Sequence, residues 1–168
     1  MNIFLIGMMG SGKSSVGHSL SKYLTNTFYD LDKEVEKRFN LSIKDIFIEY
    51  GEDLFRKEEN KVLKEFEISS GFIVSTGGGI VLSEENRTIL KKNKTYFLEA
   101  DIEDMYERAI KRENDRPLLK GMDITEFKDL YMKRRDLYIE SATATINVGK
   151  KSIEDLTIEI INNEKNII

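Results

Sequence analysis

The stretch "GMMGSGKSS", residues Gly7–Ser15, decides how this chain is interpreted. It fits the pattern G-x-x-x-x-G-K-[ST], in which glycines let the backbone wrap closely around an anion. A short apolar run, Ile3–Ile6, precedes the stretch, and a helical pattern follows it. Backbone N–H groups and a helix N-terminus would then face a phosphate group. The stretch predicts a nucleoside triphosphate site, and a plain Gly-rich turn between strand and helix is the alternative.

The polar residues of this loop have distinct expected tasks. Lys13 should reach the β- and γ-phosphates, and the hydroxyl of Ser14 should ligate Mg²⁺. The residues that we expect to contact the nucleotide are Gly10, Ser11, Gly12, Lys13, Ser14 and Ser15. The loop leaves the reaction open, because switches, motors and small-molecule kinases all use such a cradle.

Strand and helix patterns alternate on both sides of the loop, through all 168 residues. Apolar runs predict strands at residues 3–6, 28–30, 72–75, 95–100 and 143–148. Helices are expected at about residues 12–24, 32–40, 52–69, 84–92, 102–110 and 124–139, with others beginning near residues 42 and 152. This alternation predicts an α/β fold of three layers, in which a parallel sheet has helices on both faces. Ligands of such sheets bind at the carboxyl ends of the strands.

Composition narrows the class of protein. The length fits a single domain, residues 1–168. A net charge of −4 argues against a nucleic-acid partner, and the absence of cysteine rules out disulfides and thiolate metal sites. No apolar run is long enough to span a bilayer. We therefore expect a cytoplasmic protein without a membrane or nucleic-acid partner, and we expect a monomer.

Two aspartates follow the second predicted strand in "TFYDLD", Thr27–Asp32. In an extended chain Asp30 and Asp32 would point to the same side and repel each other. A metal and a substrate would offset that repulsion if one carboxylate holds hydrated Mg²⁺ and the other accepts a proton from a substrate hydroxyl. The alternative is that Asp32 only caps the following helix.

Two further stretches predict a substrate site for an anion. Arg56 lies three residues before Glu59, which can orient its guanidinium for a bidentate contact with a carboxylate; a surface ion pair is the alternative. The glycines of "STGGGI", Gly77–Gly79, follow a buried strand and would let a small ring lie against bare backbone. A plain strand-to-helix turn is the alternative there.

A charged stretch between two predicted helices contains the only proline of the chain, Pro117. Arg116 next to it could swing over the phosphates and neutralise charge in a transition state. The stretch, about residues 111–123, is interpreted as a lid that excludes water. Two more cations, Arg134 and Arg135, occur late in the following helix.

Taken together, these motifs resemble the shikimate kinase family over about residues 1–160. The loop alone is shared widely, but its combination with five other motifs in the same order is specific. Those motifs are F-x-D-x-D at Phe28–Asp32, F-R-x-x-E at Phe55–Glu59, G-G-G at Gly77–Gly79, R-P-L-L at Arg116–Leu119 and R-x-x-L-Y at Arg134–Tyr138. The resemblance implies a five-stranded sheet like that of the P-loop nucleoside monophosphate kinases, a substrate-binding helical region at about residues 31–60 and a lid.

The resemblance also implies an activity, which is transfer of the γ-phosphoryl group of ATP to the 3-hydroxyl of shikimate, with Mg²⁺. The residue roles that it implies are as follows: Lys13, Asp32 and Arg116 act in catalysis; Ser14 and Asp30 hold Mg²⁺; Arg108 and Arg116 contact the nucleotide; Asp32, Arg56, Gly77, Gly78, Gly79 and Arg134 bind shikimate. Two alternatives stay open: a gluconate- or nucleotide-directed kinase on the same scaffold, and a non-catalytic sensor of shikimate and ATP.

Overall fold

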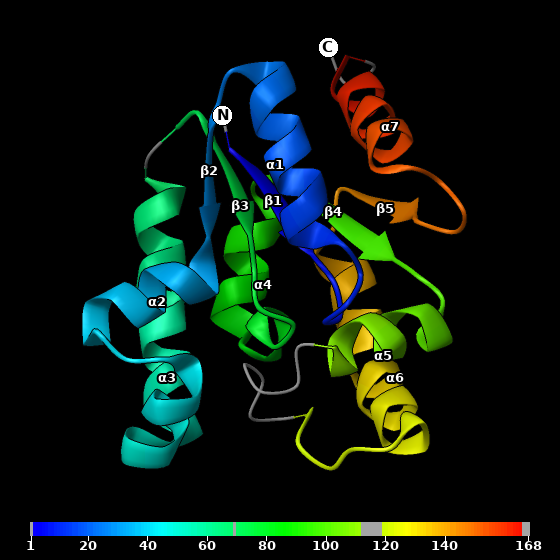
Figure 1. The fold of residues 1–168 in the computed structure, drawn as a ribbon. Coiled ribbons are helices and arrows are strands. Elements are labelled where there is room, and N and C mark those ends of the chain that lie inside the picture. Colours follow the sequence, from blue (N-terminus) through cyan, green and yellow to red (C-terminus); the bar gives the residue numbers. More distant parts are fainter. Residues whose placement is uncertain (1, 69, 112–118, 166–168) are drawn as a thin grey trace.

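A computed structural model describes residues 2–68, 70–111 and 119–165, with residue 165 described by its backbone alone. Five parallel strands form one sheet in the order β2-β3-β1-β4-β5 (Figure 1). The strands are β1 (Ile3–Ile6), β2 (Thr27–Asp30), β3 (Phe72–Ser75), β4 (Lys94–Glu99) and β5 (Ala144–Asn147). The expected α/β fold with a five-stranded parallel sheet is confirmed.

Helices cover both faces of the sheet, which makes three layers (Figure 1). On one face α1 (Lys13–Leu24) packs beside α7 (Ile153–Lys165). On the other face lie α3 (Ile43–Glu67), α4 (Glu84–Lys91) and α6 (Ile124–Ser141). Three further helices lie toward the carboxyl ends of the strands: α2 (Leu31–Phe39), α5 (Ile102–Ile110) and the 3-10 turn η1 (Ile80–Leu82).

The central strand fixes the position of the first motif. All four residues of β1 are buried, since helices cover the sheet on both sides. The strand leads directly into the glycine loop and then into α1, so burial of β1 holds the loop at the carboxyl edge of the sheet. The 3-10 turn η1 was not expected from the sequence.

The expectation for the two aspartates was wrong in its geometry. The chain is extended only as far as Asp30, and α2 begins at Leu31, whose side chain is fully buried. The side chain of Asp30 caps α2 by accepting a hydrogen bond from the backbone N–H of Lys33 at 3.4 Å. Asp32 therefore lies in the first turn of a helix and is not the capping residue.

Helix α3 contains a break that the sequence pattern anticipated as two separate helices. Gly51 has φ 81° and ψ 168°, a combination that is not helical and that side-chain-bearing residues avoid. Residues 43–50 turn toward α2, whereas the longer second part runs back along the sheet and contacts α4 (Figure 1). The break therefore separates a small substructure beside α2 from the body of the fold.

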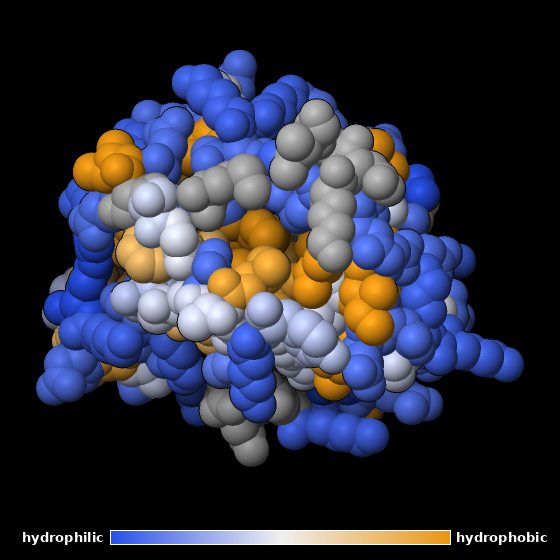
Figure 2. Space-filling view, turned by 90° about the horizontal axis from the view of Figure 1, so that it is seen from above, coloured by the Kyte–Doolittle hydropathy of each residue, from blue (hydrophilic) through white to orange (hydrophobic). Residues whose placement is uncertain are grey.

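The end of the molecule at the amino ends of the strands differs in character from the carboxyl end. Hydrophilic residues surround an apolar area near its middle (Figure 2). The glycine loop, the two aspartates and the glycine triplet identified in the sequence lie at the other end, where β1, β2 and β3 finish. Across the described residues, none of the helices has both the length and the apolar composition that crossing a bilayer would need.

Candidate active site

The glycine loop forms one wall of a cavity of about 290 Å³ at the carboxyl end of β1. It is lined by Gly10, Gly12, Lys13, Ser14, Ser15, Arg108 and Lys111. Gly10 has φ 83°, and a Cβ there would collide with the backbone carbonyl of Met105 on α5. Gly12 has φ 96° with no atom within 4 Å of an added Cβ, so its face is open to a ligand. The loop is thus shaped by backbone that only glycine tolerates, as an anion cradle needs.

Lys13 lies over this loop rather than out in solvent. Its Nζ donates hydrogen bonds to the carbonyl oxygens of Gly7 and Met8, each at 2.9 Å. Its side chain is largely buried, with a relative exposure of 8% for the residue. Ser11 is fully buried inside the loop, where its hydroxyl accepts a hydrogen bond from Nζ of Lys13 at 3.5 Å. A cation held in this position lies where a triphosphate would need it.

Arg108 of α5 lies at the edge of the same cavity. Its Nη1 donates to the carbonyl oxygen of Gly10 at 3.2 Å, and its Nη2 pairs with Asp104 at 3.2 Å. The contact joins α5 to the glycine loop a second time, beside the contact of Gly10 with Met105. A planar guanidinium at this place can stack on an aromatic base.

Three oxygen-bearing side chains meet where β1, β2 and β3 end. The hydroxyl of Ser14 donates to Oδ2 of Asp30 at 3.0 Å and lies 3.4 Å from the hydroxyl of Ser75. Mg²⁺ prefers oxygen ligands and is usually bound by one or two carboxylates together with waters and substrate phosphates. Within the described residues no group of three or more His, Cys, Asp or Glu could form a closed metal cage. The oxygens present fit a magnesium ion that is shared with a nucleotide.

A larger cleft of about 770 Å³ continues from this point toward α2 and the first part of α3. Asp32 lines it together with Lys13, Gly77 and Gly78, so the phosphate loop and the glycine triplet share one space. Oδ1 of Asp32 is buried without a hydrogen-bond partner in the described structure. A Cβ added to Gly77 would lie 2.6 Å from that oxygen, so the carboxylate of Asp32 fits here only because Gly77 has no side chain.

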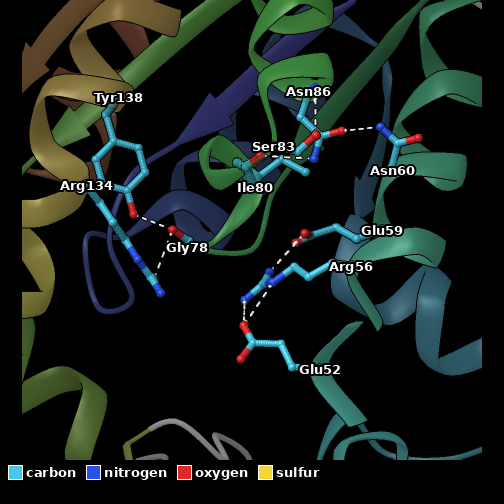
Figure 3. A network of polar contacts seen from close by, with 10 residues as sticks. All are labelled: Glu52, Arg56, Glu59, Asn60, Gly78, Ile80, Ser83, Asn86, Arg134 and Tyr138. Carbon is cyan, nitrogen blue, oxygen red and sulfur yellow. Dashed lines mark hydrogen bonds and ion pairs between the residues drawn. The ribbon is translucent and has the colours of Figure 1, made fainter. Parts of the chain in front are cut away.

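Arg56 and Glu59 form a buried ion pair at the side of the cleft (Figure 3). Nη1 of Arg56 contacts Oε2 of Glu59 at 2.9 Å, and Nη2 contacts Glu52 at 2.9 Å. The side chain of Glu59 is 0% exposed, which excludes the alternative of a surface ion pair. The guanidinium of Arg56 lies against Gly79, where a Cβ would collide with it. The third glycine therefore makes room for the arginine.

Arg134 approaches the glycine triplet from the opposite side. It is 4% exposed, and its Nη1 donates to the carbonyl oxygen of Gly78 at 3.2 Å. Figure 3 shows the guanidinium groups of Arg134 and Arg56 pointing toward the same space in front of Gly78. Arg135 instead pairs with Glu99 at 2.7 Å and lies away from this space. Two arginines that face each other across bare backbone can bind a carboxylate from both sides.

Burial changes the proton affinity of the two carboxyl groups beside the cleft. Desolvation raises the pKa of Asp32 to about 6, and the negative charge of Asp30 adds to the effect. Desolvation raises the pKa of Glu59 to about 7, although the neighbouring Arg56 opposes it. An added Cβ on Gly77 would lie 3.0 Å from Oε1 of Glu59, so both carboxyl groups adjoin the same glycine.

These raised pKa values predict how stability depends on pH in the unliganded protein. The folded state binds protons on Asp32 and Glu59 that the unfolded chain releases, so their contribution to stability is lost as the pH rises through about 6 to 7. We expect the free energy of unfolding to fall more between about pH 5 and pH 8 in the wild type than in Glu59→Gln. Urea unfolding at both pH values measures it, with the exposed Glu49→Gln as the control. Equal pH slopes for wild type and Glu59→Gln would contradict the expectation.

The structure brings together most of the residues that the sequence singled out. Ser14, Asp30, Asp32, Gly77 and Gly78 line the larger cleft, Arg56 and Arg134 contact Gly79 and Gly78 beside it, and Arg108 lines the smaller cavity with Lys13. Arg116 and residues 112–118 of the expected lid lie outside the described residues. Sequence reasoning missed Ser75 and gave Tyr138 no role, although the hydroxyl of Tyr138 donates to the carbonyl oxygen of Gly78. Both lie within quoted stretches, Ser75 at the start of "STGGGI" and Tyr138 at the end of R-x-x-L-Y, but nothing in those patterns indicated their contacts.

Comparison with known proteins gives one consistent family. The family model described as "Shikimate kinase" matches residues 9–164. A shikimate kinase of Nitrosospira multiformis is 43% identical over 153 residues, covering 90% of this chain and 78% of that protein. A structure of shikimate kinase from Acinetobacter baumannii in complex with shikimate has a TM-score of 0.93 at 33% identity, covering 98% of this chain and 93% of that one. A gluconokinase from Sinorhizobium meliloti, at 15% identity and a TM-score of 0.56, covers 99% of this chain and 92% of its own and shares the fold alone.

Proposed function

The chain belongs to the shikimate kinase family, and we propose that it transfers the γ-phosphoryl group of ATP to the 3-hydroxyl of shikimate in the cleft described above. The observation that carries the proposal is the placement of two arginines, Arg56 and Arg134, against the glycine triplet, whose Gly77 and Gly78 line the cleft that Asp32 shares with the phosphate loop. Shikimate is a small carboxylate with three hydroxyl groups, so it needs cations at one end and a hydroxyl acceptor at the other.

In the reaction the bond between the γ-phosphorus and the β-γ bridging oxygen breaks, and a bond from the γ-phosphorus to the 3-hydroxyl oxygen forms. Asp32 accepts the hydroxyl proton, a role that suits a carboxyl group whose pKa lies near 6, close to the operating pH. Lys13 neutralises charge on the phosphates. Ser14 and Asp30 would hold Mg²⁺, which would supply further positive charge at the phosphates. Arg116, outside the described residues, is proposed to contact the transferred group.

The remaining assignments are proposals of the same kind. Backbone of Gly10, Ser11 and Gly12 and the side chain of Ser15 serve the phosphates, and Arg108 stacks on adenine. Backbone N–H groups of Gly77–Gly79 serve the substrate. We propose about residues 31–60 as the substrate-binding region, in line with the lining of the large cleft by α2 and the start of α3. Residues 111–123 are the proposed lid. The proposed oligomeric state is a monomer, and analytical ultracentrifugation tests it.

A coupled assay with ATP, Mg²⁺ and shikimate tests the proposed reaction. We expect ADP to form in step with shikimate 3-phosphate, and gluconate or a nucleoside monophosphate to give no comparable product. Turnover of gluconate without turnover of shikimate would refute the acceptor. Binding of both ATP and shikimate without any product would instead favour the sensor.

Arg56→Lys tests the proposed grip on the carboxylate. Lysine keeps the charge but loses the bidentate fork, so the KM for shikimate should rise about tenfold, with a smaller change in kcat. Steady-state kinetics with varied shikimate measure the change. Arg38→Lys is the matched control, because Arg38 pairs with Glu58 and Glu65 outside the cleft. An unchanged KM for Arg56→Lys would place the substrate carboxylate elsewhere.

A further inference from the structure

The carbonyl oxygen of Gly78 accepts two hydrogen bonds from α6 (Figure 3). Nη1 of Arg134 donates at 3.2 Å, and the hydroxyl of Tyr138 donates over a shorter distance. The two side chains are four residues apart and so lie on one face of the helix. A carbonyl oxygen has two lone pairs, and this pair of donors uses both of them.

Tyr138 is held more firmly than a residue at the surface could be. It is fully buried, and its ring stacks on Phe97 with 5.0 Å between the centroids and 22° between the planes. Its hydroxyl also lies 3.9 Å from the sulfur of Met8 in the phosphate loop. Burial raises the pKa of Tyr138 to about 12, so the hydroxyl stays protonated and remains a donor.

Arg134 serves one backbone group and has a second proposed partner. Its Nη1 bonds the carbonyl of Gly78, whereas the proposed function needs its guanidinium at the substrate carboxylate. Gly78 lines the cleft, but its carbonyl oxygen faces α6, where the residue that reaches it, Tyr138, is fully buried. A carbonyl in such surroundings is costly to leave without a donor.

We propose that Tyr138 is a positioning residue for the acceptor, because its hydroxyl holds the Gly78 carbonyl while Arg134 turns to the substrate carboxylate. The inference rests on the proposed function. The described peptide bonds are trans, so the N–H of Gly79 points opposite to the carbonyl of Gly78 and therefore away from α6. Gly79 adjoins the guanidinium of Arg56, so the peptide bond between Gly78 and Gly79 lies between the two arginines.

Tyr138→Phe removes the hydroxyl and keeps the stacked ring. Arg134 then becomes the remaining side-chain donor to the carbonyl, so its departure leaves that group unsatisfied. We expect the Kd for shikimate, measured by calorimetry, to rise about tenfold, and the Kd for a non-hydrolysable ATP analogue to stay within about twofold. Tyr131→Phe is the matched control, since the hydroxyl of Tyr131 on the same helix bonds Glu99. An unchanged Kd for shikimate, or an equal loss for the ATP analogue, overturns the proposal.

A double-mutant cycle separates this role from a merely structural one. In an Arg134→Met background no arginine has to leave the carbonyl, so adding Tyr138→Phe should change the Kd for shikimate by less than about twofold. NMR titration reaches the weak affinities of these variants. A structural role would leave the tenfold effect in both backgrounds, and that result overturns the proposal.

A crystal structure of the wild-type protein with shikimate tests the proposal without relying on the folding of any variant. We expect Arg134 on the substrate carboxylate and the hydroxyl of Tyr138 still on the Gly78 carbonyl; Arg134 still bonded to Gly78 overturns the proposal. Failure of the wild type to bind shikimate refutes the proposed function and this inference with it. Wild-type binding with an unaffected Tyr138→Phe variant refutes this inference alone.

Discussion

Asp32→Asn is expected to lower kcat with shikimate by about 10²- to 10⁴-fold and to leave the Kd for ATP within about twofold. Asparagine keeps the shape of the side chain and can still accept a hydrogen bond, but it cannot take the hydroxyl proton. Steady-state rates and calorimetry of ATP binding measure the two quantities. Asp53→Asn is the control, because Asp53 is an exposed acidic residue of α3.

The pH profile gives the same prediction a second readout. Burial raises the pKa of Asp32 to about 6, so the ionised base is lost as the pH falls through that value. The kcat/KM of the wild type should therefore decline on the acid side of about pH 6, and this limb should be absent from Asp32→Asn. Equal losses of kcat and ATP affinity would show that Asp32 supports the nucleotide site beside Asp30 instead.

Lys13→Met is expected to lower kcat by about 10²- to 10³-fold, because a preorganised cation at the phosphates is removed. Methionine has a similar length and no charge. The variant also loses the hydrogen bonds from Nζ to the carbonyls of Gly7 and Met8, so a thermal melt is needed to show that the loop still folds. Lys22→Met, in the last turn of the same helix, is the control. Unchanged turnover in a folded Lys13→Met variant would remove the lysine from the reaction.

Much of the fold could be predicted from the sequence because its central strands, β1, β3 and β4, are largely buried. Continuous apolar runs such as Ile3–Ile6 are typical of central strands in an alternating α/β chain. The exact start of α2 could not be predicted in this way. It depends on the local cap that Asp30 provides and on burial of Leu31, which is determined by packing with other parts of the chain.

The same distinction between local sequence pattern and tertiary packing applies to the residues of the site. Motif spacing indicated Lys13 and Arg56 because their chemistry is tied to local patterns. Spacing could not show that Glu59 is completely buried, that Ser75 joins Ser14, or that Tyr138 reaches Gly78, since these features depend on segments tens of residues apart. Local sequence therefore indicates which side chains belong to the site. Tertiary packing determines how far they are shielded from water and which hydrogen bonds hold them.

The unpartnered oxygen of Asp32 has a consequence for selectivity among alcohols. A buried carboxylate oxygen without a hydrogen-bond donor favours a ligand that places a hydroxyl group against it. It disfavours a ligand in which a hydrogen atom replaces that hydroxyl group. Enzymes built in this way reject analogues lacking the hydroxyl by factors on the order of 10⁴ to 10⁵, with no proofreading step. A deoxy analogue of the same volume is therefore a poor substrate, because it leaves Oδ1 of Asp32 without a hydrogen-bond donor.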